Sequence, residues 1–270
     1  MKLRLWPFRR GGGGSATARR VAALRAEFNR PATPGGDPDA QRRLARGMKS
    51  GGAVKLREHL LARTKFFDRV VLDAIEHGVD QVVIVGAGYD DRALRFRAPG
   101  VCFYELDHPH TQADKRRRLE SFADGPVLVP VDFVRDDVAE LLDAAGHSAE
   151  RPTLFVCEGL LVYLELADIA ELLGGLASRA SEGSELAASL AVHPFGMQSE
   201  ALLAAVNAAR GRSADAEPWR TILPADSHLS LLRQAGWSEF EALDDSDLVP
   251  SATPGHSLLV RAAVRLASRA

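Results

Sequence analysis

The chain has few cysteines, no long apolar run and almost no net charge, and these shortages exclude several classes of protein. Its 270 residues include 2 cysteines, Cys102 and Cys157, too few for a disulfide scaffold. Both stand in apolar runs, where a buried structural thiol is the ordinary role. The formal net charge is -2, so no overall positive field would recruit nucleic acid. The composition therefore predicts a globular protein that binds something smaller.

The N-terminus is basic and then rich in glycine. Residues 1–10 read MKLRLWPFRR, and four glycines follow directly, so the apolar core of a signal peptide is missing. We expect residues 1–15 to form a flexible basic tail, because such segments order poorly. A membrane-surface or nucleic-acid role for this tail is the less favoured alternative. With no run near the ~20 apolar residues of a membrane span, we expect a cytoplasmic protein.

Apolar spacing typical of helices runs through residues 16–77. It predicts one helix over residues 16–29, ended by the segment PATPGGDPDA. It predicts a second helix over residues 41–77, ended by Gly78, since glycine commonly closes helices.

After Gly78 the pattern changes to short runs rich in β-branched residues. The run QVVIVGAG at residues 81–88 is typical of a parallel strand buried on both faces. Further strands are predicted over residues 101–107, 126–132, 153–159, 185–192, 238–243 and 256–264. Helical stretches separate most of them, over residues 90–95, 109–121, 135–145 and 166–181. The alternation predicts an α/β protein with a doubly wound, mostly parallel sheet.

In such a sheet, ligands bind beyond the carboxyl ends of the strands. The first strand delivers Gly86 and Gly88, which let a ligand approach the backbone because they lack a Cβ. The second strand ends at Asp107, and an acid about twenty residues beyond a glycine turn commonly holds a ribose. Tight turns use glycine without any ligand, but the two features together indicate a ligand of the adenosine type.

The residues after the glycine turn argue against a phosphate-bearing ligand. A dinucleotide fingerprint needs a third glycine, whereas Asp91 stands at that position, preceded by Asp90. These carboxylates would repel a pyrophosphate, and no phosphate-binding loop motif occurs. S-adenosylmethionine, which has no phosphate and carries a sulfonium cation, fits better.

Two further strands end in side chains suited to the same ligand. Asp132 and Phe133 follow the third strand and could meet the edge and face of an adenine. Asp132 could equally cap the helix that starts near Arg135. Glu158 ends the fourth strand in an almost uncharged run and needs a cationic partner. Either the ammonium of the ligand or a nearby arginine would serve.

Five blocks of sequence resemble the leucine carboxyl methyltransferase-like branch of the class I S-adenosylmethionine-dependent methyltransferases. The blocks are ARTKFFDRVVLDAIEHGVDQVVIVGAGYDDRALRF, FYELDHPHTQADKRRRL, VPVDFVRDD, FVCEGLLVYL and EPWRTILPADSHLSLLRQAGW. Their order and spacing agree with the branch from residue 16 to about residue 264. The resemblance implies a Rossmann-like sheet of seven strands over residues 78–270, S-adenosyl-L-methionine as the cofactor, and a helical lid over residues 16–77 that covers the acceptor.

The resemblance also implies a role for each residue that matches the motifs. Arg63 would hold the cofactor carboxylate, and Glu158 would receive the amino group. Gly86 and Gly88 would line the methionine portion. Asp107 would take the ribose, and Asp132 with Phe133 would meet the adenine. Asp91 departs from the family, which usually has threonine there, so it either alters cofactor contacts or caps the helix.

No strong catalytic dyad stands out, which agrees with an acceptor carboxylate that is already ionised and needs no general base. Arg25 and His193 are candidates to bind the acceptor, and Tyr163 to donate to it. Ordinary surface, loop and core roles are open for all three. His108 and His110 share no further ligand at metal spacing, so no metal site is expected.

The predicted function is methylation of a small-molecule carboxylate or hydroxyl by in-line displacement. One alternative is a non-catalytic sensor that binds S-adenosylmethionine. The other, less favoured because of Asp90 and Asp91, is an NAD(P)-dependent oxidoreductase with a degenerate fingerprint. The sequence does not give the acceptor or the oligomeric state.

Overall fold

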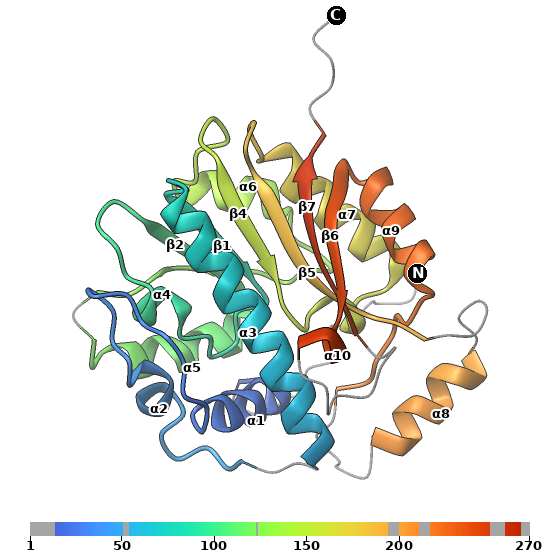
Figure 1. The fold of residues 1–270 in the computed structure, drawn as a ribbon, viewed down its shortest axis with the longest axis horizontal. Coiled ribbons are helices and arrows are strands. Elements are labelled where there is room, and N and C mark those ends of the chain that lie inside the picture. The colour runs from blue at the N-terminus through green and yellow to red at the C-terminus, as the bar shows by residue number, and fades with distance from the viewer. Residues whose placement is uncertain are drawn as a thin grey trace, which may run out of the picture.

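A computed structural model describes residues 14–50, 54–122, 124–193, 200–210, 217–248 and 257–265. It contains a seven-stranded sheet in the order β3-β2-β1-β4-β5-β7-β6 (Figure 1). The strands are β1 (Gln81–Val85), β2 (Cys102–Asp107), β3 (Val127–Pro130), β4 (Thr153–Cys157), β5 (Glu185–Ala191), β6 (Trp237–Asp244) and β7 (Ser257–Val264). β1 to β5 pair in parallel, and β7 pairs antiparallel with β5 and β6. The predicted doubly wound, mostly parallel sheet is confirmed.

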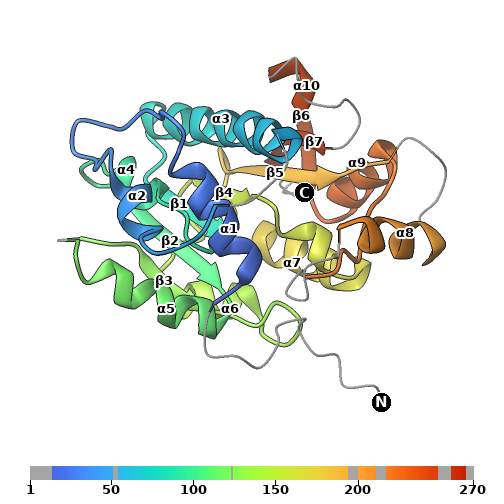
Figure 2. The same ribbon diagram turned by 90° about the horizontal axis from the view of Figure 1, so that it is seen from below.

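Helices cover both faces of the sheet. They are α1 (Ala16–Arg25), α2 (Ala40–Leu44), α3 (Val54–Glu76), α4 (Arg92–Arg95), α5 (Pro109–Leu119), α6 (Val138–Ala144), α7 (Leu166–Ser178), α8 (Glu200–Arg210), α9 (Ala225–Gln234) and α10 (Asp245–Leu248). In Figure 2 the sheet is seen on edge, with α3 on one side and α6 and α7 on the other. None of the helices in the described part of the chain is both long and apolar enough to cross a membrane.

The strands are apolar on both faces because each face meets a layer of helices. In β1, Val82 and Ile84 belong to the core beneath α3, whereas Val83 and Val85 belong to the core beneath α6 and α7. The second core extends to Trp237, whose indole donates to the Leu173 carbonyl at 3.0 Å. Charged residues that follow the parallel strands lie instead at the carboxyl edge of the sheet, where α/β sheets bind ligands.

The predicted helix over residues 41–77 is wrong, since the segment contains two helices, α2 and α3. Gly47 between them has φ +77°, a left-handed conformation that ends regular helix. The helix predicted over residues 16–29 is also shorter and ends at Arg25. Gly78, with φ +86°, closes α3 as predicted. The helices α8 and α9 were not predicted.

The two ends of the N-terminal helical region lie in different places. The C-terminal half of α3 packs on the sheet through Phe67, Val70 and Val71 and forms part of the core. The helices α1 and α2 lie instead at the carboxyl ends of the strands (Figure 2). Residues 1–13 of the predicted tail lie outside the described residues, whereas Ser15 is buried and caps α1.

Candidate functional site

The carboxyl ends of β1, β2 and β4 meet at one edge of the sheet, beneath α1. The N–H groups of Gly86 and Ala87 donate to the Leu106 carbonyl at 2.8 and 2.9 Å, which fixes the glycine turn against β2. Gly88 has φ +51°, and a Cβ there would lie 2.9 Å from the Cβ of Ala18 in α1. Glycine is therefore required for the close approach of α1. At Gly86 a Cβ would meet the side chain of Leu160.

Asp107 is tied to the glycine turn through its carboxylate. Its Oδ2 accepts from the Gly88 N–H at 2.6 Å, and its Oδ1 accepts from the His108 N–H at 2.7 Å. Burial raises the pKa of this carboxyl to about 6, although the two backbone donors oppose the rise. The side chain of Thr111 is a third hydrogen-bond partner of this carboxylate, which leaves one of its four lone pairs for a further hydroxyl group.

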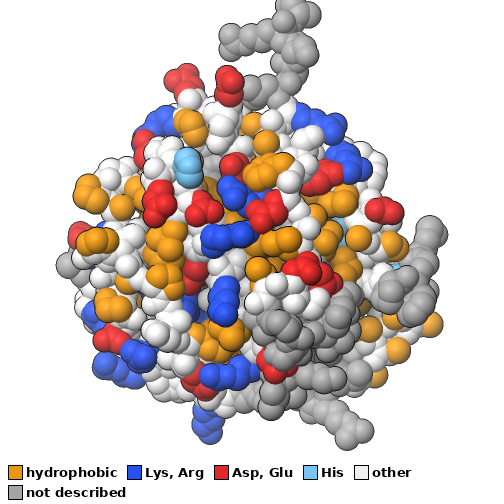
Figure 3. Space-filling view, in the orientation of Figure 1, with side chains coloured by type: hydrophobic (Ala, Val, Ile, Leu, Met, Phe, Trp, Pro, Cys, Tyr) orange, Lys and Arg blue, Asp and Glu red, His pale blue; other side chains and the backbone are white. Residues whose placement is uncertain are grey.

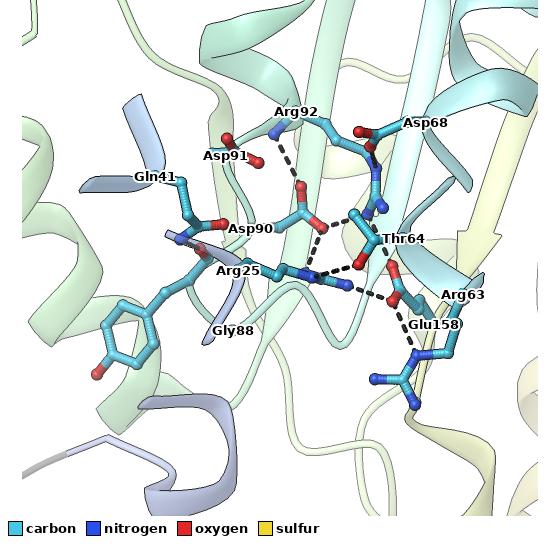
Figure 4. Close-up of polar contacts among 12 residues, drawn as sticks. Arg25, Gln41, Arg63, Thr64, Asp68, Gly88, Asp90, Asp91, Arg92 and Glu158 are labelled. Atoms are coloured by element: carbon cyan, nitrogen blue, oxygen red, sulfur yellow. Dashed lines mark hydrogen bonds and ion pairs between the residues drawn. The ribbon is translucent and has the colours of Figure 1, made fainter. Parts of the chain in front are cut away.

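Glu158 has the cationic partner that its apolar surroundings predict, and the partner is arginine. Its Oε1 contacts Arg25 and accepts from Arg63 Nε at 2.9 Å, while its Oε2 accepts from Arg92 Nη1 at 2.8 Å (Figure 4). Burial alone would raise the pKa of this carboxyl, but the three arginines hold it well below its usual range. Glu158 is therefore ionised, and both of its oxygens are engaged by the protein.

Arg92 connects this glutamate to the glycine turn and to α3. Its side chain is fully buried, its Nη1 lies 2.5 Å from Asp90 Oδ2, and its Nε lies 2.9 Å from Asp68 Oδ1. Asp90 also contacts Arg25 at 3.3 Å. We call the complete set the arginine–carboxylate cluster. It contains five arginines and four carboxylates, hence one surplus positive charge: Arg25, Arg30, Arg63, Arg92, Arg95, Asp68, Asp90, Asp91 and Glu158.

Asp91 is fully buried in this cluster and does not cap α4 with its side chain. Its Oδ1 accepts from Arg30 Nη2 at 2.8 Å, and its Oδ2 accepts from Arg95 Nε at 3.0 Å. Burial would raise its pKa, but these arginines keep it well below the ordinary value. Of the two roles considered for this departure from the family pattern, capping is wrong. The carboxylate instead ties the segment after α1 to the segment after β1.

Arg63 is the most exposed arginine of the cluster, with 25% of its side chain accessible. It stands on α3, and its Nε donates to Glu158. In Figure 4 its terminal nitrogens point away from Glu158. A Cβ at Gly159 would lie 3.4 Å from Nη2. These nitrogens are thus placed to meet an anion beyond the end of β4.

Contacts at both ends hold α1 over the site. At its start, Ser15 donates through Oγ to Glu217 at 2.8 Å and through its N–H to Thr111 Oγ1 at 3.3 Å. Arg19 lies 3.2 Å from Asp114 of α5. At its end, Arg25 enters the arginine–carboxylate cluster. The helix therefore forms a strap across the carboxyl ends of the strands.

Asp132 and Phe133 follow β3, next to the end of β2, where the Val131 N–H donates to the Asp107 carbonyl at 2.9 Å. Asp132 accepts from the Val134 N–H at 3.1 Å and does not cap the following helix. That cap is Asp137, whose Oδ1 accepts from two N–H groups of α6. Phe133 is buried in the core beneath α6 and α7.

The three acceptor candidates lie in different surroundings. Tyr163 is half-buried in the short turn after Glu158, and half-buried His193 follows β5, with its N–H donating to the Leu223 carbonyl at 3.3 Å. Arg25 is buried, and its guanidinium contacts Thr64, Asp90 and Glu158. In this conformation it is a member of the cluster and not a group that an acceptor could reach.

Four members of the cluster were not predicted from the sequence: Arg30, Asp68, Arg92 and Arg95. Asp68 and Thr64 stand four residues apart on the apolar stripe of α3 and are buried. Polar residues at such positions could have indicated a buried polar site. Arg92 and Arg95 carried no such signal. His108 caps α5 with its ring, accepting from the His110 N–H at 3.3 Å. Among the described residues no group of three His, Cys, Asp or Glu is arranged to hold a metal.

A family model described as leucine carboxyl methyltransferase matches residues 20–177, which is more than half of the chain. The chain belongs to the leucine carboxyl methyltransferase family. The matched segment of this family member includes the second half of α1, the glycine turn, Asp107 and Glu158. The arginine–carboxylate cluster therefore lies entirely within the region that defines the family.

Curated relatives match a segment of similar length. A protein of Mycolicibacterium gilvum named "Putative S-adenosyl-L-methionine-dependent methyltransferase" is 39% identical over 155 residues, which cover 56% of this chain and 48% of the relative. A protein of Parafrankia sp. with the same type of name is 37% identical over 155 residues, with the same shares. This family member thus spans about half the length of the curated relatives it matches.

Solved structures share the fold at low sequence identity. A "putative methyltransferase" of Thermobifida fusca has a TM-score of 0.58 at 16% identity and covers 95% of this chain and 97% of its own. The magnesium protoporphyrin IX methyltransferase of Synechocystis, solved with bound SAH, has a TM-score of 0.52 at 16% identity, with shares of 84% and 94%. These likenesses confirm the Rossmann-like fold expected for the leucine carboxyl methyltransferase family.

Proposed function

We propose that the protein is an S-adenosyl-L-methionine-dependent methyltransferase acting on a small-molecule carboxylate or hydroxyl. The observation that carries the proposal is the convergence of Gly88, the buried Asp107 and the Arg63–Glu158 pair at one edge of the sheet. This set offers an acceptor for a ribose, a guanidinium for a carboxylate and a carboxylate for an ammonium. The names of the curated relatives and the family membership support it.

Each polar part of the cofactor has a chemically matched group. We assign the ribose to Asp107, the cofactor carboxylate to the terminal nitrogens of Arg63, and the amino group to Glu158. An arginine–carboxylate contact is charge-assisted and commonly bidentate, so Arg63 would fix the orientation of the methionine portion beside Gly86 and Gly88. We assign the adenine to the segment after β3, where the Asp132 carboxylate can accept from an exocyclic amine and the buried ring of Phe133 supports the backbone from the core.

The amino group competes with the arginines for Glu158, because Oε1 already accepts from Arg25 and Arg63 and Oε2 accepts from Arg92. Arg92 is held by two carboxylates at 2.5 and 2.9 Å, whereas the one other carboxylate beside Arg25 lies 3.3 Å away. Arg63 has the carboxylate of the cofactor to bind. Arg25 is the remaining candidate to withdraw, and it belongs to α1, the helix that also covers Gly88. We therefore assign α1 and α2 as a lid that opens for the cofactor. Only the first turns of α3 belong to this lid, because its C-terminal half is part of the core.

When bound, S-adenosyl-L-methionine supplies a methyl group on a sulfonium, which an acceptor oxygen takes by in-line displacement. The protein orients the reacting groups and excludes water beneath α1. A carboxylate acceptor is ionised at neutral pH and needs no proton removed. A hydroxyl acceptor would lose a proton, and Tyr163 and His193 are our candidates to position it.

Transfer of labelled methyl from S-adenosyl-L-methionine to a fractionated metabolite extract tests the proposal. We expect label in a small-molecule fraction with the native protein and none with Asp107→Ala. Base treatment separates the acceptor classes, since a methyl ester releases methanol whereas a methyl ether is stable. Binding of S-adenosylhomocysteine without transfer to any fraction would favour a sensor and contradict the enzymatic role.

A further inference from the structure

Lys115 is a fully buried lysine that has no role in the cofactor contacts assigned above. It stands on α5, and 1% of its side chain is accessible. Its ammonium contacts the carboxylate of Glu105 on β2 and donates to the Asp90 carbonyl at 2.7 Å. Burying a lysine is costly unless its charge is paired and its hydrogen bonds are made. The position is therefore a specialised one.

The hydrogen bond to Asp90 anchors the glycine turn from outside. Within the turn, the Asp90 N–H donates to the Ala87 carbonyl at 2.8 Å, and Gly88 between them donates to Asp107. Because its ammonium contacts both the Asp90 carbonyl and Glu105, Lys115 connects the end of this turn to β2. The backbone that would border the cofactor is thus fixed on one side by Asp107 and on the other by Lys115.

The ion pair with Glu105 affects Asp107, because the two carboxylates stand two residues apart on one face of β2. Burial raises the pKa of Glu105 to about 7 and that of Asp107 to about 6, and Lys115 opposes both rises. The charged groups that act on this pair are Asp90 after β1 and Lys115 on α5. His108 at the start of α5 meets Asp107 through its backbone N–H, and Asp132 after β3 acts on the His108 ring. Of these, Lys115 is the cation that opposes protonation of both carboxylates.

We propose that Lys115 is a positioning residue of the cofactor site, which fixes the glycine turn through Asp90 and pairs with the carboxylate of Glu105, two residues before Asp107 on the same face of β2. The proposal rests on the assignment of the ribose to Asp107. A lysine with a merely structural role would change stability when replaced, but it would not change the pH at which Asp107 takes up a proton.

The decisive measurement is an NMR titration of the aspartate side-chain carboxyls in the ligand-free protein, with Asp107→Asn to identify the signal. We expect Lys115→Met to raise the apparent pKa of Asp107 by about one unit and Lys115→Arg to raise it less. Arg116→Met, which removes an exposed charge from the next position of α5, should leave it unchanged. An unchanged pKa in Lys115→Met would overturn the proposal.

Calorimetric binding of S-adenosylhomocysteine at several pH values tests whether the change in the pKa of Asp107 affects the cofactor site. Near pH 6.5 a rise in the pKa of Asp107 from about 6 to about 7 lowers its ionised fraction roughly threefold, so we expect Lys115→Met to bind roughly threefold more weakly than the native protein, with the gap narrowing at higher pH. A loss of affinity that is the same at every pH would overturn the electrostatic part. If the native protein does not bind S-adenosylhomocysteine at all, the proposed function fails, while the ligand-free titration still decides the role of Lys115.

The double variant Glu105→Gln/Lys115→Met keeps the test valid if the single variant does not fold. It removes one charge of each sign from the same buried pair. We expect it to fold and to raise the pKa of Asp107 as Lys115→Met does, because a buried Glu105 without its lysine is already neutral near pH 6. We also expect a loss of affinity that persists at high pH, because the turn has lost its anchor. Native affinity in this double variant would contradict the anchoring of Asp90.

Discussion

Replacing Arg25 by methionine should lower stability and yet strengthen cofactor binding. The side chain is 7% accessible and contacts Glu158, Asp90 and Thr64. Removing one partner of a buried ion pair commonly costs about 3–5 kcal/mol. Here Glu158 keeps two arginines and the cluster loses its surplus positive charge, so we expect a smaller loss of about 1–3 kcal/mol. For a chain near this length that lowers Tm by roughly 5 °C.

The gain in affinity follows from the competition between Arg25 and the amino group of the cofactor for Glu158. Withdrawing the arginine breaks a charged hydrogen bond worth about 1.5–3 kcal/mol. A variant that lacks it should bind S-adenosylhomocysteine roughly ten- to a hundredfold more tightly. Calorimetric titration and a thermal melt of the same sample measure the two effects together.

Arg57→Met is the matched control, because it removes an arginine that pairs with Glu27 near the surface, with side-chain accessibilities of 43% and 41%. Such exposed pairs contribute about 0–1 kcal/mol, and we expect little change in affinity. If Arg25→Met weakens binding as much as Arg63→Met does, Arg25 holds the cofactor directly. The account of α1 as a lid that must release Glu158 would then be refuted.

Three further predictions concern the other parts of the site. Asp107→Ala should weaken S-adenosylhomocysteine binding roughly ten- to a hundredfold by calorimetry, through the loss of charged hydrogen bonds; unchanged affinity would move the ribose site elsewhere. Asp91→Thr introduces the residue usual in the family and should lower the free energy of unfolding by about 3–5 kcal/mol in denaturant titration, because Arg30 and Arg95 lose a partner. Adding Arg30→Met should recover part of that loss. Equal stability of Asp91→Thr and the native protein would contradict the pairing. Deleting residues 1–13 should preserve binding, whereas deleting residues 1–50, which removes α1 and α2, should abolish methyl transfer; full activity of the longer deletion would rule out the lid.

The strands could be predicted because their signal is local. Each parallel strand is buried on both faces, so runs such as QVVIV and TLFVC are apolar throughout and stand out from the surrounding helices. The break between α2 and α3 was missed because apolar spacing continues past it. Gly47 ends regular structure there through its positive φ, which a count of apolar positions does not detect.

The carboxylates of the site could be predicted, but their partners could not. Asp107 and Glu158 come directly after strands, and the fold rule for α/β sheets points to such positions. The arginines that engage Glu158 come from 133, 95 and 66 residues away in sequence. Their placement depends on how α1, α3 and α4 pack, and no local pattern records that. The closure of α1 over Gly88 likewise depends on the tertiary fold.

The central claim is that this edge of the sheet binds S-adenosyl-L-methionine, and a thermal-shift comparison tests it most directly. A ligand at about 100 times its dissociation constant stabilises the folded protein by ~2.7 kcal/mol, which corresponds to a rise in Tm of about 5–10 °C for a chain near this length. We predict such a rise with S-adenosyl-L-methionine and S-adenosylhomocysteine and none with NADH, NADPH or ATP. A rise with a dinucleotide, and none with either sulfur compound, would contradict the account.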